Sequence, residues 1–351
     1  MSLHLRPVQF VDTPVTHADG AVARLAGGLQ WFAAYEVIEP GKRRTVAVAE
    51  IATLGDRAAR LHAAITAPRP PLQLGERTLR LDQPLVAGIL NVTPDSFSDG
   101  GQHSDDPAAA AAAGVDMAAA GAALVDLGGE STRPGAAQVW EGDEIARVVP
   151  VVERLARSGT PVSIDTRKAA VMEAALATGA HIVNDVSALL WDERALDVVV
   201  RAQCPVVLMH SPDPREGGHA RTGYRDVLTD VFDWLEARIA AVVAAGVEVT
   251  RIIVDPGIGF GKTLAENLAL INGLALFHGL GCPIMLGASR KRMIGALDHE
   301  APVAARLGGS LALALKGAEA GVQLLRVHDV AATVQALRVW RGLRDRALVG
   351  G

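Results

Sequence analysis

The strongest constraint on the fold of this chain is an alternation that repeats eight times after residue 84. A short, continuously apolar run ends in polar or glycine residues, and a longer segment of helical character follows. Continuous apolar runs are typical of strands that are covered on both faces, as in parallel sheets flanked by helices. The eight runs are residues 85–91, 123–128, 161–165, 181–186, 205–210, 251–255, 283–287 and 324–328.

Two architectures accommodate eight such units, a closed barrel and a large open parallel sheet. In a barrel most carboxyl ends of the strands carry chemistry, whereas an open sheet concentrates it at a switch point. All eight runs end in polar or glycine-rich clusters here, and the length is close to that of a barrel. We therefore predict an α/β fold, a (β/α)8 TIM barrel that occupies residues 71–351 and forms the catalytic domain.

Three of the intervening helices carry clear boundary signals. Residues 105–121 begin with acids and a proline and end at a glycine, and residues 224–246 form a long helix that ends at Gly246. The helix over residues 166–180 is predicted to begin at Thr166 as its N-cap and to end at Gly179.

The first 70 residues do not follow this pattern. Residues 30–51 predict two strands around a turn at Pro40-Gly41, and residues 54–66 predict one short helix. Two strands and a helix bury little core alone, so we predict a small N-terminal α/β extension, residues 1–70, of unknown role. It should pack on the barrel or on a second subunit. Residues 67–84 predict a linker and a short hairpin that covers the barrel bottom.

Composition excludes several classes of partner. The net charge of −5 shows no global basic footprint, which disfavours nucleic-acid binding. The longest apolar tract, 108–127, contains Asp116 and predicts a helix followed by a strand, not a membrane span. Cys204 and Cys282 have no zinc or redox spacing, so we predict buried thiols in a reducing cytosol. With no apolar signal core at the N-terminus, the prediction is a cytoplasmic protein without membrane partners.

Polar residues at three neighbouring strand ends indicate a ligand pocket. Asp165, Asn184 and Asp255 supply two carboxylates and an amide. Any one aspartate could simply cap the next helix, but together on one barrel face they suit a flat, donor-rich heterocycle such as an aminopyrimidinone. A metal site is the rival interpretation, although zinc would favour histidine or cysteine ligands. Lys291 could donate to a carbonyl oxygen and a ring nitrogen of the same ligand.

A second group is basic and amide-rich. Asn91 belongs to the first strand, and Arg326 and His328 to the last, so a closed barrel brings the three together. They suit a phosphate or pyrophosphate, with Mg²⁺ bridging its oxygens beside Asn91. The stretch "GIGFGK" (257–262) lacks a full phosphate-loop pattern. We interpret its glycines as allowing close approach and Phe260 as an aromatic wall.

Seven motifs, taken together, resemble the dihydropteroate synthase family. They are "GILNVTPDSFSDGG", "GGESTRPGA", "SIDT", "VNDVS", "DPGIGFGK", "SRK" and "RVHDV", in the family's order and over residues 75–345. The resemblance implies an enzyme that condenses 6-hydroxymethyl-7,8-dihydropterin pyrophosphate with p-aminobenzoate in folate biosynthesis. It also implies Mg²⁺ as cofactor and a homodimer.

The resemblance assigns roles to individual residues. Where many members have serine after the lysine of "SRK", this chain has Arg292, which we expect to hold the p-aminobenzoate carboxylate, unless the amides at the helix start do so. The implied catalytic residues are Asp165, Asp255, Lys291, Arg326 and His328. The implied contacts are Asp165, Asn184, Met209, Asp255, Gly287 and Lys291 for pterin; Asn91, Arg326 and His328 for pyrophosphate; Asn91 for the metal; and residues 92–104, Thr132, Arg133, Pro134, Phe260, Lys291 and Arg292 for p-aminobenzoate.

Two other functions share part of this pattern. A methyltransferase that passes a methyl group from a folate to a corrinoid protein would share the Asp/Asn/Asp pocket but not the remaining motifs. A pterin-binding protein without catalysis would keep the pocket and release no pyrophosphate.

Overall fold

The core of the molecule is an eight-stranded parallel sheet that closes on itself. The structure is a computed structural model that describes residues 3–93, 106–131, 137–214 and 223–348. The strand order is β12-β11-β10-β9-β8-β7-β14-β13, and Val254 of β12 bonds to the segment that enters β13. The strands are β7 (Leu85–Asn91), β8 (Leu124–Gly128), β9 (Val162–Asp165), β10 (Ile182–Asp185), β11 (Val206–Met209), β12 (Ile252–Asp255), β13 (Met285–Leu286) and β14 (Leu324–Val327).

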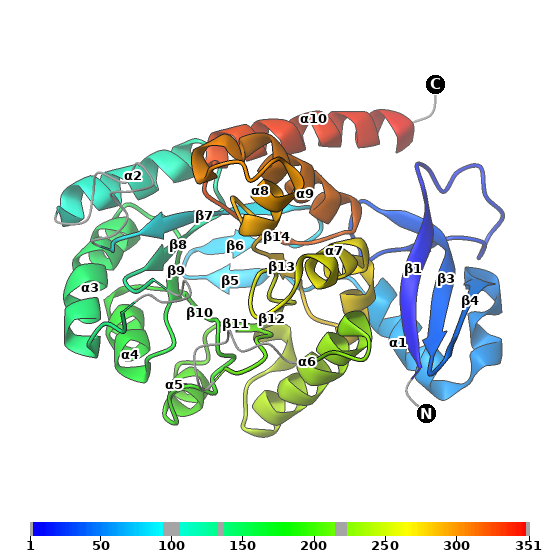
Figure 1. Cartoon of the computed structure of the whole chain (residues 1–351), viewed down its shortest axis with the longest axis horizontal. Helices are drawn as coiled ribbons and strands as arrows, with labels where there is room; N and C mark the ends of the chain where they lie inside the picture. The colour runs from blue at the N-terminus through cyan, green and yellow to red at the C-terminus, as the bar shows by residue number, and fades with distance from the viewer. Residues whose placement is uncertain (1–2, 94–105, 132–136, 215–222, 349–351) are drawn as a thin grey trace.

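Helices surround this barrel (Figure 1). The predicted barrel is confirmed, and each of the eight apolar runs contains one strand. The helices are α2 (Pro107–Ala119), α3 (Glu141–Arg157), α4 (Ala169–Thr178), α5 (Ala195–Ala202), α6 (Val227–Ala244), α7 (Leu264–Asn272), α8 (Arg292–Leu297), α9 (Leu307–Glu319) and α10 (Val330–Leu348), with 3-10 turns η3 (Val249–Arg251), η4 (Leu274–Leu280) and η5 (Val303–Ala305).

The N-cap prediction for α4 is wrong. The helix begins after Lys168, and the hydroxyl of Thr166 accepts instead from the amide of Lys168 at 3.3 Å. The amide of Ala169 donates to the carboxylate of Asp192, which comes from the loop after the next strand, at 2.8 Å. A cap supplied from 23 residues away leaves no local signal in the sequence. The predicted ends at Gly179 and Gly246 are confirmed, since both helices stop there and both glycines have positive φ.

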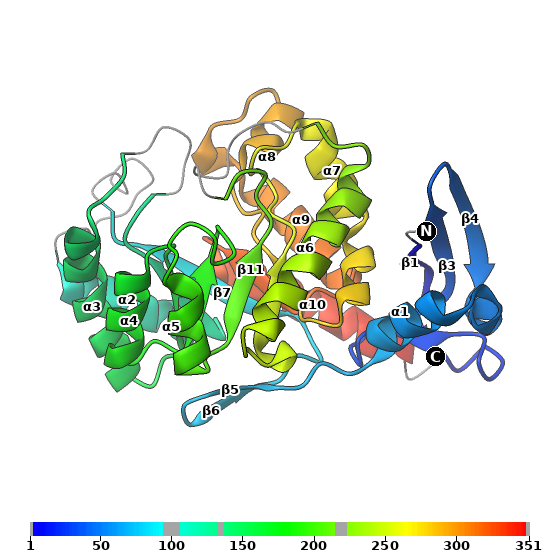
Figure 2. The same ribbon diagram turned by 90° about the horizontal axis from the view of Figure 1, so that it is seen from below.

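The predicted hairpin closes the bottom of the barrel. β5 (Leu72–Leu74) and β6 (Arg77–Leu79) pair antiparallel, and Figure 2 places them below the barrel, with α8 above it. Leu72, Leu74, Leu79 and Leu81 are buried against the first residues of the strands. The opposite end of the barrel, where the strands finish, is therefore the end that can hold a site.

The N-terminal unit contains more structure than predicted. The two predicted strands, β3 (Trp31–Glu39) and β4 (Lys42–Ala47), and the helix α1 (Asp56–Thr66) are confirmed. The structure adds β1 (His4–Val11), β2 (Ala23–Arg24) and η1 (Val48–Leu54). β1 pairs with β3 through residues that lie far along the chain and carries Pro7, which edge strands tolerate. With Phe32 and Tyr35 fully buried, the unit holds more core than two strands and a helix would.

This unit packs against α6 and η4 of the barrel (Figure 1). His4 contacts Asp233 of α6 at 2.6 Å. The buried Arg69 donates to the carbonyl of His278 in η4 at 3.0 Å and to the carbonyl of Ala64 in α1 at 2.9 Å. A buried guanidinium thus joins the end of α1 to the barrel wall.

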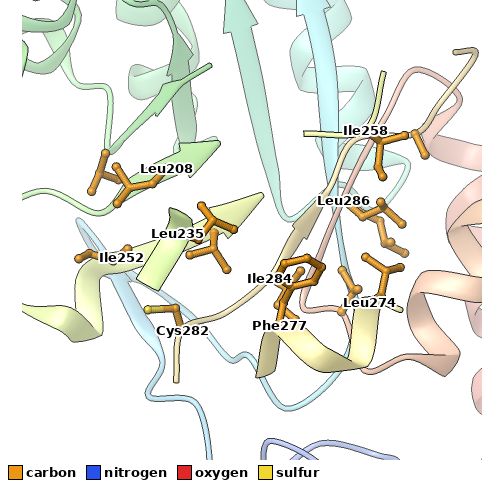
Figure 3. Close-up of a cluster of buried hydrophobic side chains, with 14 of the residues drawn as sticks. Leu208, Leu235, Ile252, Ile258, Leu274, Phe277, Cys282, Ile284 and Leu286 are labelled. Carbon is orange, nitrogen blue, oxygen red and sulfur yellow. The ribbon is translucent and has the colours of Figure 1, made fainter. Parts of the chain in front are cut away.

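An apolar layer fills the space between the strands and α6 with η4. Figure 3 shows Leu208 and Ile252 of neighbouring strands beside Leu235 of α6, with Phe277 of η4 next to Ile284. Cys282 lies in this layer, and Cys204 is buried elsewhere in the same core. Burial raises the pKa of Cys282 to about 12 and that of Cys204 to about 11, which fits the prediction of buried, unreactive thiols. In the described ranges, no helix combines the length and the apolar character that a membrane span requires.

Candidate functional site at the carboxyl ends of the strands

The parallel register brings the predicted residues to one level of the barrel. Asp165 of β9 pairs in register with Asn184 of β10, and Met209 of β11 with Asp255 of β12. Asn91 of β7 lies opposite Gly128 of β8, which in turn lies opposite Asp165. The carboxyl ends of these strands therefore line one mouth.

Arg326 is the centre of this mouth. Its Nε donates to Asp126 of β8 at 2.5 Å, and one of its terminal nitrogens donates to Asp165 at 2.5 Å. Asn184 donates from its amide nitrogen to the two Asp126 oxygens at 3.1 and 3.3 Å. The sequence placed Arg326 with the anion-binding residues. In the structure its guanidinium is held by Asp165 of the predicted pterin group and by Asp126, which was not predicted, so Arg326 joins the two groups.

Asp126 is a site residue that the sequence reasoning missed. Its side chain is 2% exposed, against 20% for Arg326. A carboxylate this deeply buried requires a charged or hydrogen-bonding partner. The sequence did carry a signal for Asp126, because this acid lies inside the apolar run 123–128 rather than at its end. A strand covered on both faces leaves an ionised side chain without solvent, so an acid at such a position needs a partner in the fold.

Burial and the neighbouring charges act in opposite directions on the pKa values of Asp165 and Arg326. Burial raises the pKa of Asp165 to about 7, with the Asp126 carboxylate adding to the effect and the Arg326 guanidinium working against it. Burial acts against the charge of Arg326, but the carboxylates of Asp126 and Asp165 outweigh it and raise the pKa of Arg326. Among the residues that the structure describes, the second oxygen of Asp165 is buried without a hydrogen-bond partner. That oxygen is suited to accept from a ligand.

Asp255 is fixed by the glycine loop that follows it. Its carboxylate accepts from the amide of Gly257 at 2.7 Å, and burial raises its pKa. Gly257 has φ of 70°, and a Cβ there would overlap the carbonyl oxygen of His210. Lys262 donates to the carbonyls of Gly257 and Phe260 at 2.8 and 3.1 Å. The loop is therefore held by the half-buried side chain of Lys262, in line with close approach rather than phosphate binding.

Lys291 projects into the same mouth from the start of α8. Its ammonium donates to the carbonyl of Ile258 and lies 4.5 Å from the centre of the Phe260 ring. Burial lowers the pKa of Lys291 to about 8. Gly287 borders the same mouth, since a Cβ on it would be in ordinary van der Waals contact with Asp255, at 3.7 Å, and with Arg326, at 3.9 Å.

His328 and Asn91 flank the cluster. Nδ1 of His328 lies 3.0 Å from the hydroxyl of Ser289, which also accepts from the His328 amide at 3.2 Å. Asn91 is an exposed end residue of β7, and its side-chain oxygen lies beside Gly128. β7 and β14 are neighbours in the sheet, as the closed barrel requires.

The structure describes only some of the residues that were predicted to bind p-aminobenzoate. Phe260 packs against Lys291, and Arg292 is the exposed first residue of α8. Thr132, Arg133, Pro134 and residues 94–104 of the first loop lie outside the described residues.

The donor set at Asn91 fits a weakly held Mg²⁺. In the described ranges no group of three or more His, Cys, Asp or Glu is arranged to hold a metal ion. Mg²⁺ commonly keeps several waters and takes one or two protein oxygens together with substrate phosphates. The exposed amide oxygen of Asn91 can supply one such ligand.

Comparison with known proteins adds independent information. The family model described as "Pterin binding enzyme" matches residues 87–328. The dihydropteroate synthase of Neisseria meningitidis serogroup B is 45% identical over 276 residues, which cover 77% of this chain and 96% of that protein. Nearly a quarter of the present chain lies outside that match.

Two solved structures of the Xanthomonas albilineans dihydropteroate synthase are similar in fold. The structure with 4-aminobenzoic acid is 48% identical, with a TM-score of 0.74, and covers 79% of this chain and 99% of that one. The complex with 7,8-dihydropteroate is 46% identical, with a TM-score of 0.71, and covers 79% and 100%.

Proposed function

This chain belongs to the dihydropteroate synthase family of pterin-binding enzymes, and we propose that its barrel joins a dihydropterin to p-aminobenzoate. The reaction transfers the whole dihydropterin-6-ylmethyl group of 6-hydroxymethyl-7,8-dihydropterin pyrophosphate to the amine of p-aminobenzoate, giving 7,8-dihydropteroate and pyrophosphate for folate biosynthesis. The enzyme is thus a transferase. The observation that carries this proposal is the placement of Arg326 between Asp126 and Asp165 at the barrel mouth.

The pterin would bind where acceptors face one another. Asp165 has a buried oxygen without a hydrogen-bond partner among the described residues, and Asp255 lies beside Gly287, next to Arg326. Both acids can accept from ring N–H and amino groups, while Asn184, held by Asp126, offers its amide oxygen. Met209 supplies an apolar contact, and Lys291 can donate to the pterin carbonyl.

Charge explains how these residues would promote the reaction. The departing pyrophosphate is anionic, and Arg326 and His328 would stabilise the charge that builds on it. Asn91 would hold Mg²⁺, whose positive charge offsets that of the leaving group when the ion is bound. The methylene carbon left behind is cationic, so the negative potential of Asp165 and Asp255 favours it. The amine of p-aminobenzoate attacks that carbon, with Phe260 and Arg292 lining its site.

No covalent enzyme nucleophile is required. The chain's two cysteines are buried, and burial raises the pKa of each thiol. The aryl amine itself is the nucleophile, and the proton that it loses can pass to water or to the pyrophosphate.

Further parts of the proposal concern location and assembly. The enzyme is cytoplasmic and forms a homodimer. Val339 and Leu343, one helical turn apart on α10, are 62% and 69% exposed and offer an apolar strip that suits an interface. We divide the chain at residue 70, because the preceding residues form a sheet and helix that lie outside the barrel (Figure 1).

Pyrophosphate release tests the function directly. The full chain is mixed with dihydropterin pyrophosphate, p-aminobenzoate and Mg²⁺, and release is measured with each component omitted in turn. We expect release that requires both the amine and Mg²⁺. Pterin binding without release would support a non-catalytic pterin-binding protein. Methyl transfer from a methylated folate to a corrinoid protein would support the methyltransferase.

The pH dependence of the reaction should report on Lys291. Its pKa is lowered to about 8, so its positive charge is lost as the pH rises through about 8. We expect kcat/KM to fall over that range. In Lys291→Arg the charge persists, because arginine stays protonated to about pH 12 or above, and the fall should move to higher pH by about two units or more. If kcat/KM of this variant fell over the same alkaline pH range as that of the unaltered chain, the titrating group would be one other than Lys291.

A further inference from the structure

We propose that Arg290 and Asp329 form a positioning pair that fixes Lys291 and His328 relative to each other across the barrel mouth. Each partner is the immediate chain neighbour of one of these site residues. The inference rests on the proposed function, since it concerns the same reaction. Neither residue was predicted from the sequence, and neither is suggested to touch substrate.

The contact between them is a two-point ion pair. Nε of Arg290 lies 3.0 Å from one oxygen of Asp329, and a terminal nitrogen lies 2.6 Å from the other. The side chains are 26% and 18% exposed. A bidentate arginine–carboxylate pair fixes orientation as well as distance, and partial burial shields it from water and salt. It is therefore better suited to holding two loops together than an exposed single-contact pair.

A second link runs beside the first. Ser289 contacts His328, with its hydroxyl 3.0 Å from Nδ1 and accepting from the His328 amide at 3.2 Å. Ser289 and Arg290, in the loop after β13, thus contact His328 and Asp329, in the loop after β14. The contact at Nδ1 sets the orientation of the His328 ring, because the bond made by one ring nitrogen fixes where the other points.

The backbone at Arg290 is held in an unusual conformation. Its φ is 56°, a left-handed value that residues other than glycine rarely adopt. The amide of Arg290 donates to the hydroxyl of Ser310 at 2.9 Å, and its carbonyl accepts from Arg306 at 3.0 Å. This turn determines the direction in which the chain leaves toward Lys291. Unfavourable conformations that are held by several contacts tend to occur at functional sites.

These contacts have a consequence for the proposed reaction. Lys291 lies against Ile258 and Phe260, on the side where the two substrates would be joined. His328 lies on the side where the pyrophosphate would depart. If the pair Arg290–Asp329 opens, the two loops can move independently, and the charges at the two ends of the breaking bond lose their fixed spacing. Catalysis is sensitive to displacements of about 1 Å.

The test uses four full-length variants: Asp329→Asn, Arg290→Lys, Arg290→Asp and the charge-reversed double variant Arg290→Asp/Asp329→Arg. Asp329→Asn keeps the shape and removes the charge, while Arg290→Lys keeps the charge and removes the two-point geometry. We expect kcat for pyrophosphate release to fall about 10- to 100-fold in both. The affinity for 7,8-dihydropterin, which lacks the pyrophosphate, should change by less than about 3-fold because Asp165, Asn184 and Asp255 remain.

Charge reversal separates positioning from general damage. Aspartate tolerates left-handed φ values, so it can occupy position 290. The double variant should recover at least about 5-fold of the kcat lost in Arg290→Asp alone, as expected for residues that interact directly. Arg341→Ala is the matched control. It breaks an exposed Arg–Asp pair on α10, Arg341–Asp345, and should leave kcat unchanged.

The outcomes distinguish this inference from the function on which it rests. Absence of pyrophosphate release by the unaltered chain would count against the proposed function itself. Release by the unaltered chain, with unchanged kcat in Asp329→Asn and Arg290→Lys, would overturn the positioning pair alone. Loss of folded structure in both single variants, seen by circular dichroism, would also overturn it, because the pair would then be a general stabiliser.

Discussion

Replacing Gly257 with alanine should lower the free energy of unfolding by about 4 kcal/mol or more and abolish turnover. The added Cβ would overlap the carbonyl oxygen of His210 and lie 3.0 Å from its carbonyl carbon. Both are backbone atoms, so no side-chain rotation relieves the clash. The positive φ adds about 1–2 kcal/mol of strain for any residue with a Cβ. Any shift of the loop also displaces the amide that binds Asp255.

Gly41→Ala provides the matched control for this substitution. Gly41 has nearly the same φ, 71°, but no atom lies within 4 Å of the position that its Cβ would take. The Gly41→Ala substitution should therefore lower the free energy of unfolding only by the backbone strain, about 1–2 kcal/mol, and leave activity intact. Urea unfolding and pyrophosphate release would be measured on both. Equal losses of stability in the two variants would show that φ, and not the contact with His210, determines the cost.

The barrel could be predicted because each strand is encoded locally. The segments that form β7 (85–91) and β12 (252–255) are apolar at nearly every position, which is what a strand covered on both faces requires. The features that were missed depend on distant partners. β1 pairs with β3 across a long stretch of chain, and the cap of α4 comes from Asp192. Neither partner is visible in a local window.

The candidate site divides in the same way. Polar residues at strand ends stand out against the apolar runs, so Asp165, Asn184 and Asp255 could be selected from the sequence. Asp126 did not stand out, because it lies within a run rather than after it. The direction of Arg326 could not be predicted either. Strand order placed it beside β7, but its length lets it reach Asp165 on β9, and only the folded charges decide that contact.

Replacing Arg326 with methionine should destabilise the fold and nearly eliminate catalysis. The change leaves Asp126 and Asp165, whose side chains are 2% and 12% exposed, without their cation. Removing one member of a buried ion pair costs about 3–5 kcal/mol, because the remaining charge is neither solvated nor paired. The loss of charge stabilisation on the departing pyrophosphate should lower kcat by about 10²- to 10³-fold or more.

The loss of stability in Arg326→Met should depend on pH in a defined direction. Burial already raises the pKa of Asp165 to about 7, and Arg326 is the group that lowers it. Without the arginine this pKa rises further above its unfolded value, so the ionised carboxylate penalises the folded state most at high pH. Protonation removes that penalty as the pH falls through the raised pKa. The difference in unfolding free energy between the unaltered chain and the variant should therefore be largest near pH 8 and shrink toward pH 5.

Urea unfolding at several pH values would measure this difference, with Arg341→Met as the control. Arg341 pairs with Asp345 on the surface of α10, with side chains 41% and 52% exposed, and such pairs contribute only about 0.3–0.5 kcal/mol. Its effect should be small at every pH. If Arg326→Met were as stable as the control at pH 8, the two carboxylates would not depend on this arginine. The charge balance on which the proposed site rests would then need another cation, and Lys291 is a candidate because the carboxylates of Asp255 and Asp165 act to raise its pKa.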